Sequence, residues 1–260
     1  MLRATGLWPF RLLSEPGLHV VAALFRGRPV PVRTVLGLRS IAVGSDPMNR
    51  GSRRSDASAL RSPDLRALLS GQVLGDWTLG TGALEELERA FDRQAPGLTI
   101  EFGSGVSTLC LAYLARRAGA GSLPAVISIE QDADHAGRTR EALARAGLDG
   151  VAAVVHAPLA MADLDGRQFS THVVPPEVGE LVGERCAEFV LVDGPAAENG
   201  ARTATLPVVR QWLRSGALVM LDDALRDGEL ETARLWLRMG WIDVEGIVIR
   251  DKGILFARIR

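Results

Sequence analysis

The chain has 260 residues, of which 47% are hydrophobic and 23% are charged, and its net charge is −1. This composition is typical of a globular protein and excludes a chain that is disordered throughout. The length fits one domain with an extension, and a core of that size needs no disulfide framework. The two cysteines, Cys110 and Cys186, are too few for a disulfide scaffold or a four-cysteine zinc site. They favour a reducing, cytoplasmic location.

Charge is distributed unevenly along the chain. Residues 1–66 carry a net charge of +7, whereas residues 67–260 carry −8. The larger part is therefore mildly acidic, which argues against a nucleic-acid partner. No run reaches the roughly 18–20 apolar residues that cross a bilayer, so no membrane span is expected.

A linker is expected before the folded part of the chain. Residues 44–63 are rich in Ser, Arg, Asp and Gly, a composition typical of linkers. We therefore divide the chain into a basic N-terminal extension with its linker, residues 1–66, and a folded domain, residues 67–260. Two interpretations of the extension stay open: it is loosely packed or disordered, or the product begins later, at Met48.

From residue 77 onward, helical and strand patterns alternate. Helices are predicted at residues 77–87, 106–117, 203–214 and 229–239. Short apolar runs predict strands at residues 98–102, 125–129, 151–156, 188–193, 216–221, 244–250 and 253–259, with a loop from 157 to about 176. This order predicts an α/β fold, a doubly wound and mostly parallel sheet that ends in an antiparallel β-hairpin.

A glycine turn, Gly103-Ser104-Gly105, lies between the first strand of this series and the helix over 106–117. Glycine allows positive φ and close backbone approach to a ligand, and a helix amino terminus offers unpaired N–H groups. Position 108 is Thr rather than the third glycine of a dinucleotide fingerprint. Glu101, just before the turn, would repel a phosphate. The pattern therefore favours a ligand with positive charge near the turn.

A second acid, Glu130, follows the next predicted strand, 29 residues after Glu101. In folds of this kind, an acid at the tip of the second strand accepts hydrogen bonds from a ribose diol. The alternative is that Glu130 only stabilises the amino terminus of the following helix. Two acids at the ends of neighbouring parallel strands favour the ligand interpretation.

The chain resembles the class I S-adenosylmethionine-dependent methyltransferases over roughly residues 78–260. The residues that carry the resemblance are the runs 100–108, 127–130, 189–195 and 216–223. It implies a seven-stranded sheet whose last strand runs antiparallel between its neighbours, with S-adenosylmethionine as cofactor. It also implies that Glu101, Gly103 and Gly105 line the methionine end and that Glu130 binds the ribose. The remaining residues of the expected cofactor site are Ser104, Ser107, Gln131, His156 and Asp193.

A finer likeness is to the catechol- and caffeoyl-type O-methyltransferases, in which acids that end strands four and five bind a divalent cation. It implies a Mg²⁺ site at Asp193, Asp222 and Asp223. Two residues depart from that pattern, because Asp223 replaces an asparagine and Ala196 replaces the expected catalytic lysine. The alternative is that Asp222 and Asp223 cap the next helix and that Asp193 closes the cofactor pocket.

Without a metal, the candidate general bases are carboxylates or imidazoles. Asp193 and Asp222 are the expected catalytic residues, and His156 and His172 are further candidates for the base. His156 fits a plain packing or loop role equally well.

The sequence thus predicts an enzyme that moves a methyl group from S-adenosylmethionine to an oxygen or nitrogen of a small molecule by direct displacement. Two alternatives stay open. One is an aminopropyl transferase that uses decarboxylated S-adenosylmethionine, and the other is a non-catalytic module that binds a nucleotide or a partner protein. The expected partner is a small-molecule acceptor; a homodimer and the identity of the acceptor are left open.

Overall fold

The computed structural model describes residues 29–30, 60–70, 79–164, 166–196, 201–249 and 252–260. Its main sheet has the strand order β1-β9-β10-β8-β7-β2-β3-β4. These strands are β1 Pro29–Val30, β2 Thr99–Phe102, β3 Val126–Glu130, β4 Ala152–His156, β7 Ala187–Val192, β8 Leu213–Leu221, β9 Ile242–Val248 and β10 Ile254–Ile259.

Five neighbouring strands, β4, β3, β2, β7 and β8, run parallel. Strand β10 is antiparallel to both of its neighbours, β8 and β9. The predicted seven-stranded sheet with an inserted antiparallel strand is confirmed, and the two residues of β1 extend its edge by pairing antiparallel with β9.

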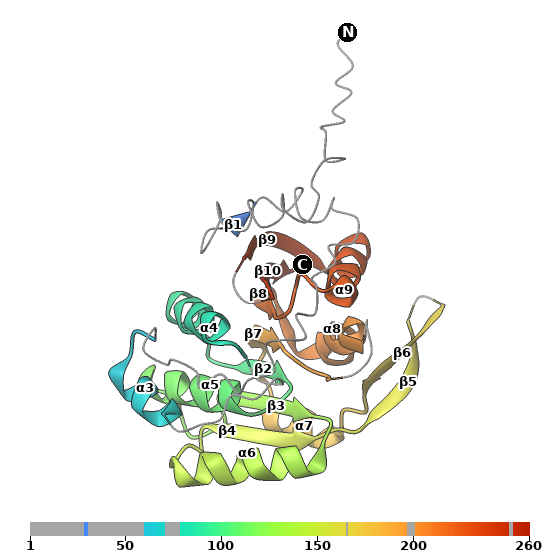
Figure 1. Ribbon diagram of the computed structural model, residues 1–260. Coiled ribbons are helices and arrows are strands. Elements are labelled where there is room, and N and C mark those ends of the chain that lie inside the picture. Colours follow the sequence, from blue (N-terminus) through green and yellow to red (C-terminus); the bar gives the residue numbers. More distant parts are fainter. Residues whose placement is uncertain (1–28, 31–59, 71–78, 165, 197–200, 250–251) are drawn as a thin grey trace, which may run out of the picture.

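Helices cover both faces of the sheet (Figure 1). The helices α3 Pro63–Leu69, α4 Thr81–Gln94, α5 Val106–Arg117 and α6 Ala133–Arg145 contribute to one hydrophobic cluster, and α7 Pro176–Val182, α8 Thr205–Val209 and α9 Asp227–Arg238 contribute to the other. Every residue of β2 and of β3 is buried, as expected for parallel strands covered on both faces. The carboxyl ends of the parallel strands therefore meet at one edge of a rigid core.

The helix predicted over 77–87 is α4, Thr81–Gln94, in the structure, and helices α3, α6 and α7 were not predicted. Two further segments differ in type from the sequence prediction. In place of a helix over 203–214, the chain forms the short turns η3 Ala201–Ala204 and η4 Arg210–Trp212 on either side of α8, and β8 already begins at Leu213. Pro207 lies within α8 and has no N–H to donate, which shortens the helical hydrogen-bond ladder.

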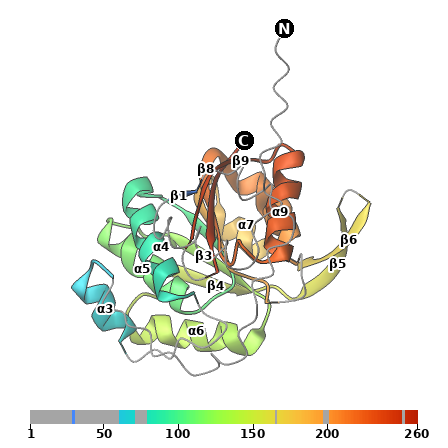
Figure 2. The same ribbon diagram turned by 45° about the horizontal axis from the view of Figure 1, so that its top comes forward.

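The second difference is the segment predicted as a loop after residue 156. It forms a two-stranded ribbon of β5 Leu159–Leu164 and β6 Arg167–His172, which extends away from the main sheet (Figures 1 and 2). The dipeptide Asp165-Gly166 is a turn signal typical of hairpins, and it could have indicated this ribbon.

The folded part of the chain includes residues that precede the predicted domain boundary. Helix α3 spans that boundary, and Leu60, Leu65 and Leu69 are buried in the core. The backbone N–H groups of Arg61 and Ser62 donate to the Glu88 carboxylate at 2.8 and 3.1 Å. The rest of the predicted extension, residues 1–28 and 31–59, lies outside the described residues. Among the described helices, none is long and apolar enough to cross a membrane.

Candidate active site

The predicted glycine turn connects β2 to α5, and it lies directly against the loop that follows β7. The backbone N–H groups of Asp193 and Gly194 both donate to the Phe102 carbonyl, at 3.1 and 2.7 Å. A Cβ atom on Gly194 would lie 2.8 Å from the Gly103 nitrogen, so this contact leaves no space for a side chain. Gly105, with φ 137°, adopts a conformation that other residues rarely take. The loop after β7 is therefore held next to the turn.

Glu101 lies beneath this turn and is fully buried. The Thr108 hydroxyl donates to Glu101 Oε2 at 2.6 Å and accepts the Gly105 N–H at 2.9 Å, whereas Glu101 Oε1 has no hydrogen-bond partner. Burial raises the pKa of Glu101 to about 7, while hydroxyls that include Ser107 and Thr108 act to lower it. The carboxyl group is therefore poised to ionise when a positive charge arrives.

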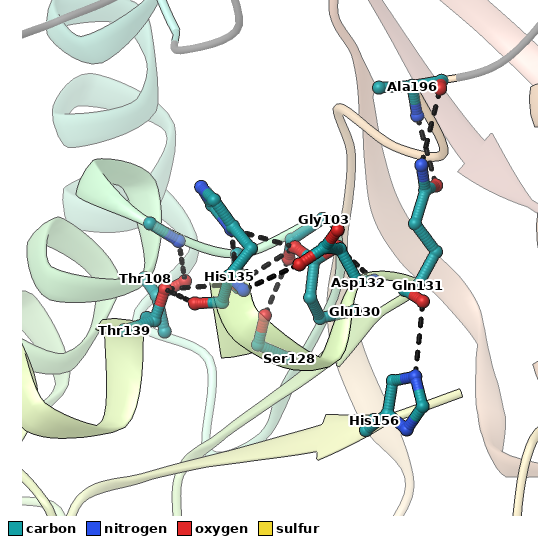
Figure 3. A network of polar contacts seen from close by, with 12 residues as sticks. Gly103, Thr108, Ser128, Glu130, Gln131, Asp132, His135, Thr139, His156 and Ala196 are labelled. Atoms are coloured by element: carbon teal, nitrogen blue, oxygen red, sulfur yellow. Dashed lines mark hydrogen bonds and ion pairs between the residues drawn. The ribbon is translucent and has the colours of Figure 1, made fainter. Parts of the chain in front are cut away.

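Glu130 ends β3 and lies at the centre of a polar network (Figure 3). Its Oε2 accepts the Ser104 hydroxyl at 2.8 Å and lies 3.2 Å from His135 Nδ1. Its Oε1 accepts the backbone N–H of Asp132 at 3.0 Å. Ser104 Oγ also lies 3.1 Å from Thr139 Oγ1. The network fixes the Glu130 carboxylate beside the glycine turn.

Gln131 joins the loops that follow β3 and β7. Its side-chain amide donates to the Ala196 carbonyl at 3.2 Å and accepts the Ala196 N–H at 3.1 Å (Figure 3). His156, at the end of β4, is exposed, and its Nε2 lies 3.2 Å from the Gln131 carbonyl oxygen. Gln131 thus fixes the backbone of Ala196, the position at which the resemblance implied a catalytic lysine.

Three aspartates converge where β7 and β8 end. Asp193, Asp222 and Asp223 each offer a carboxylate oxygen, and these oxygens lie within 4.8 Å of one another. Burial and neighbouring carboxylates, partly offset by the Arg202 charge, raise the pKa of Asp193 to about 7 and that of Asp222 well above its ordinary range. The group therefore favours the approach of positive charge.

A buried arginine, Arg202, lies against this acidic group. Its Nη1 donates to the Asp222 carbonyl at 2.8 Å. Its Nη2 lies 3.6 Å from Asp193 Oδ1 and 3.4 Å from Asp223 Oδ2, and its Nε lies 3.6 Å from Glu229 Oε1. More exposed cations contact Asp223 from outside, Arg226 at 2.8 Å and Lys252 at 3.6 Å.

The predicted residues thus lie along one edge of the sheet. The β2–α5 turn carries Gly103, Ser104 and Gly105 above Glu101, Glu130 adjoins it, and the aspartates lie on the other side of the turn. Four residues of the site were not predicted from the sequence: His135, Thr139, Arg202 and Glu229. His135 and Thr139 are four residues apart on α6, a spacing that places both on the helix face toward Glu130 and could have indicated them.

His172 lies at the end of β6, in the two-stranded ribbon rather than in the main sheet. Its ring packs against Phe102 with the ring centroids 5.3 Å apart, and neither ring nitrogen has a hydrogen-bond partner. Burial lowers the pKa of His172 to about 4, so the ring is neutral at physiological pH.

Comparisons with known proteins agree with this fold. Residues 100–224 match the family model described as a methyltransferase domain. The chain contains a methyltransferase domain. The predicted resemblance to the methyltransferases and the predicted enzyme class are thereby confirmed. No curated protein matches the chain.

Solved structures share the fold of this methyltransferase. An O-methyltransferase from Bacillus cereus, in complex with S-adenosylhomocysteine, has 15% identity and a TM-score of 0.54, covering 77% of this chain and 92% of its own. The S-adenosylhomocysteine-bound methyltransferase from Podospora anserina has 12% identity and a TM-score of 0.53, covering 98% of each chain. The O-methyltransferase TomG from Streptomyces achromogenes, in complex with S-adenosylmethionine, has 16% identity and a TM-score of 0.50, covering 80% of this chain and 91% of its own.

Proposed function

We propose that this methyltransferase moves the methyl group of S-adenosylmethionine to a hydroxyl oxygen of a small molecule. The observation that carries the proposal is the acidic group of Asp193, Asp222 and Asp223, whose oxygens lie within 4.8 Å of one another beside the glycine turn. The turn would hold the cofactor, and the acidic group would hold the acceptor. The O-methyltransferases that share the fold support an oxygen acceptor.

The cofactor would lie across the ends of β2 and β3. Glu101 is the counter-charge for the methionine ammonium, since its carboxyl is buried with one oxygen unpartnered. Glu130 would accept the ribose hydroxyls, because its Oε1 accepts a single backbone N–H and each carboxylate oxygen accepts two hydrogen bonds. Ser104 positions Glu130, and His156 would border the adenine at the end of β4.

The three aspartates suit a divalent cation. Hard cations bind oxygen ligands at about 2.0–2.6 Å, so the ligand oxygens around one ion are separated by distances comparable with 4.8 Å. Charged carboxylate oxygens are also the donors that Mg²⁺ prefers. Asp193, Asp222 and Asp223 therefore fit the ion, which would lower the pKa of an acceptor hydroxyl when bound.

The reaction itself needs little covalent chemistry from the protein. The bond between the sulfonium sulfur and its methyl group breaks, the sulfur keeps the electron pair, and a bond from the acceptor oxygen to carbon forms. Without a bound metal, the acceptor proton would pass to Asp193 or Asp222, or through either to water. The loop after β7 contacts Phe102 and Gly103, so the glycine turn and the acidic group keep a fixed relative position. This arrangement would align the cofactor with the acceptor.

The test is product formation with defined acceptors. The full chain is incubated with S-adenosylmethionine, Mg²⁺ and separate panels of small hydroxylated compounds and small amines, and S-adenosylhomocysteine is measured by mass spectrometry. We expect turnover with a hydroxylated acceptor and at least a tenfold loss in Asp222→Asn. Turnover with amines alone would contradict the oxygen acceptor. Cofactor binding without turnover on any acceptor or on a small-molecule cell extract would support the binding-module alternative instead.

A further inference from the structure

The buried side chain of Arg202 contacts the acidic group formed by Asp193, Asp222 and Asp223. Its side chain is 7% exposed, whereas those of Arg226 and Lys252, which contact the same group, are 39% and 47% exposed. A buried guanidinium is held by its partners, because solvent cannot replace them. Arg202 is thus the cation that stabilises the acidic group from within.

The guanidinium contacts two of the three aspartates through a single nitrogen. Nη2 lies 3.6 Å from Asp193 Oδ1 and 3.4 Å from Asp223 Oδ2. A divalent cation on these carboxylates would lie about 2.0–2.6 Å from their oxygens and would therefore face the guanidinium at close range. Two positive charges so close in a buried site repel each other strongly.

Glu229 offers Arg202 a second anchor. Its Oε1 lies 3.6 Å from Arg202 Nε, which has no hydrogen-bond partner, and its Oε2 is also without one. Both groups are buried, so neither unpaired atom is compensated by bulk water. A small shift of the guanidinium toward Glu229 would bring Nε within hydrogen-bond distance of Oε1, and a two-nitrogen contact would also satisfy Oε2 and release Asp193 and Asp223.

We propose that Arg202 is an internal counter-ion that competes with the divalent cation for Asp193 and Asp223, and that it moves onto Glu229 when the cation binds. The inference rests on the metal site of the proposed function. Arg202 holds the carboxylates together while the metal is absent and sets the metal affinity of the site. It is a positioning residue and does not touch the reacting atoms.

The test measures Mn²⁺ affinity of the full, ligand-free chain by calorimetry and by electron paramagnetic resonance. Arg202→Gln is expected to bind Mn²⁺ at least tenfold more tightly than the wild type. The matched control is Arg226→Gln, which removes the same charge from Asp223 at a more exposed position and should change the affinity less than threefold. Equal or weaker binding by Arg202→Gln, or an equal gain in the control, would overturn the proposal.

A second variant keeps the test decisive where Arg202→Gln fails to fold. Glu229→Gln removes the second anchor and is expected to weaken Mn²⁺ binding at least threefold, a measurement that needs no Arg202 variant. Unchanged or tighter binding by Glu229→Gln would refute the displacement. Absence of Mn²⁺ binding in every variant would also refute it, whereas the product assay with added chelator tests methyl transfer separately.

Discussion

Replacing Glu101 with glutamine should stabilise the ligand-free protein while it weakens cofactor binding. Burial raises the pKa of Glu101 from its ordinary value of 4.5 to about 7. The folded state therefore holds a proton that the unfolded chain releases, so stability is complete below pH 4.5 and is lost as the pH rises through 7. Each pKa unit corresponds to about 1.4 kcal/mol, which makes the loss about 3 kcal/mol above pH 7.

Glutamine keeps the shape of the side chain and does not ionise. Its carbonyl oxygen can accept the Thr108 hydroxyl as Glu101 Oε2 does, but its amide group would lack a partner, at a cost of about 1 kcal/mol. The expected net gain at pH 8 is about 2 kcal/mol, or roughly 4–8 °C in Tm for a domain of this size.

The assay is urea and thermal unfolding of the ligand-free protein at pH 5 and pH 8, together with calorimetric titration of S-adenosylhomocysteine. Glu101→Gln should gain stability at pH 8 relative to pH 5 and lose at least tenfold in affinity. The control is Glu141→Gln, whose side chain is 72% exposed and which should change neither quantity. A variant that is less stable than the wild type at pH 8, or that binds with unchanged affinity, would refute the reasoning.

Three further outcomes are expected. Glu130→Ala removes the proposed ribose acceptor and should lower S-adenosylhomocysteine affinity at least a hundredfold; unchanged calorimetric affinity would argue against this cofactor site. Chelation by EDTA should reduce product formation at least tenfold, with recovery on added Mg²⁺, and activity that persists in EDTA would contradict the metal site. Glu88→Ala leaves the backbone N–H groups of Arg61 and Ser62 unpaired and should destabilise the protein by about 1–3 kcal/mol in thermal unfolding, whereas an unchanged Tm would show that this contact does not hold the start of the domain.

The sheet could be predicted because its strands are short apolar runs buried on both faces, a pattern that needs no knowledge of distant contacts. The helix predicted over 106–117 has those bounds in the structure, since a glycine turn precedes it and apolar residues follow at helical spacing. Residues 203–214 also have apolar residues at helical spacing, but this segment contains Pro207. The periodicity alone did not show where the helical hydrogen bonds would be interrupted.

The acids of the site could be predicted because each lies at or just after the carboxyl end of a strand, and parallel strands end at one edge. Arg202 follows no strand, and it belongs to a short helical turn nine residues after Asp193. Its burial depends on the simultaneous placement of Asp222, Asp223 and Glu229 from two other segments. A charged residue is usually exposed, so composition and periodicity gave no reason to place it in the core.

The buried carboxyls explain why binding and protonation should be coupled. Without a ligand, burial keeps the pKa of Glu101 near 7, so at pH 6 most molecules carry a proton there. The ammonium of S-adenosylhomocysteine, which we propose to lie beside Glu101, would favour the ionised form and should expel that proton on binding. The binding enthalpy at pH 6 should therefore differ between phosphate and imidazole buffers, which differ in heat of ionisation, and the difference should shrink in Glu101→Gln. Equal enthalpies in both buffers for the wild type would mean that the cofactor's positive charge is neutralised elsewhere, and Glu101 would lose its place in the site.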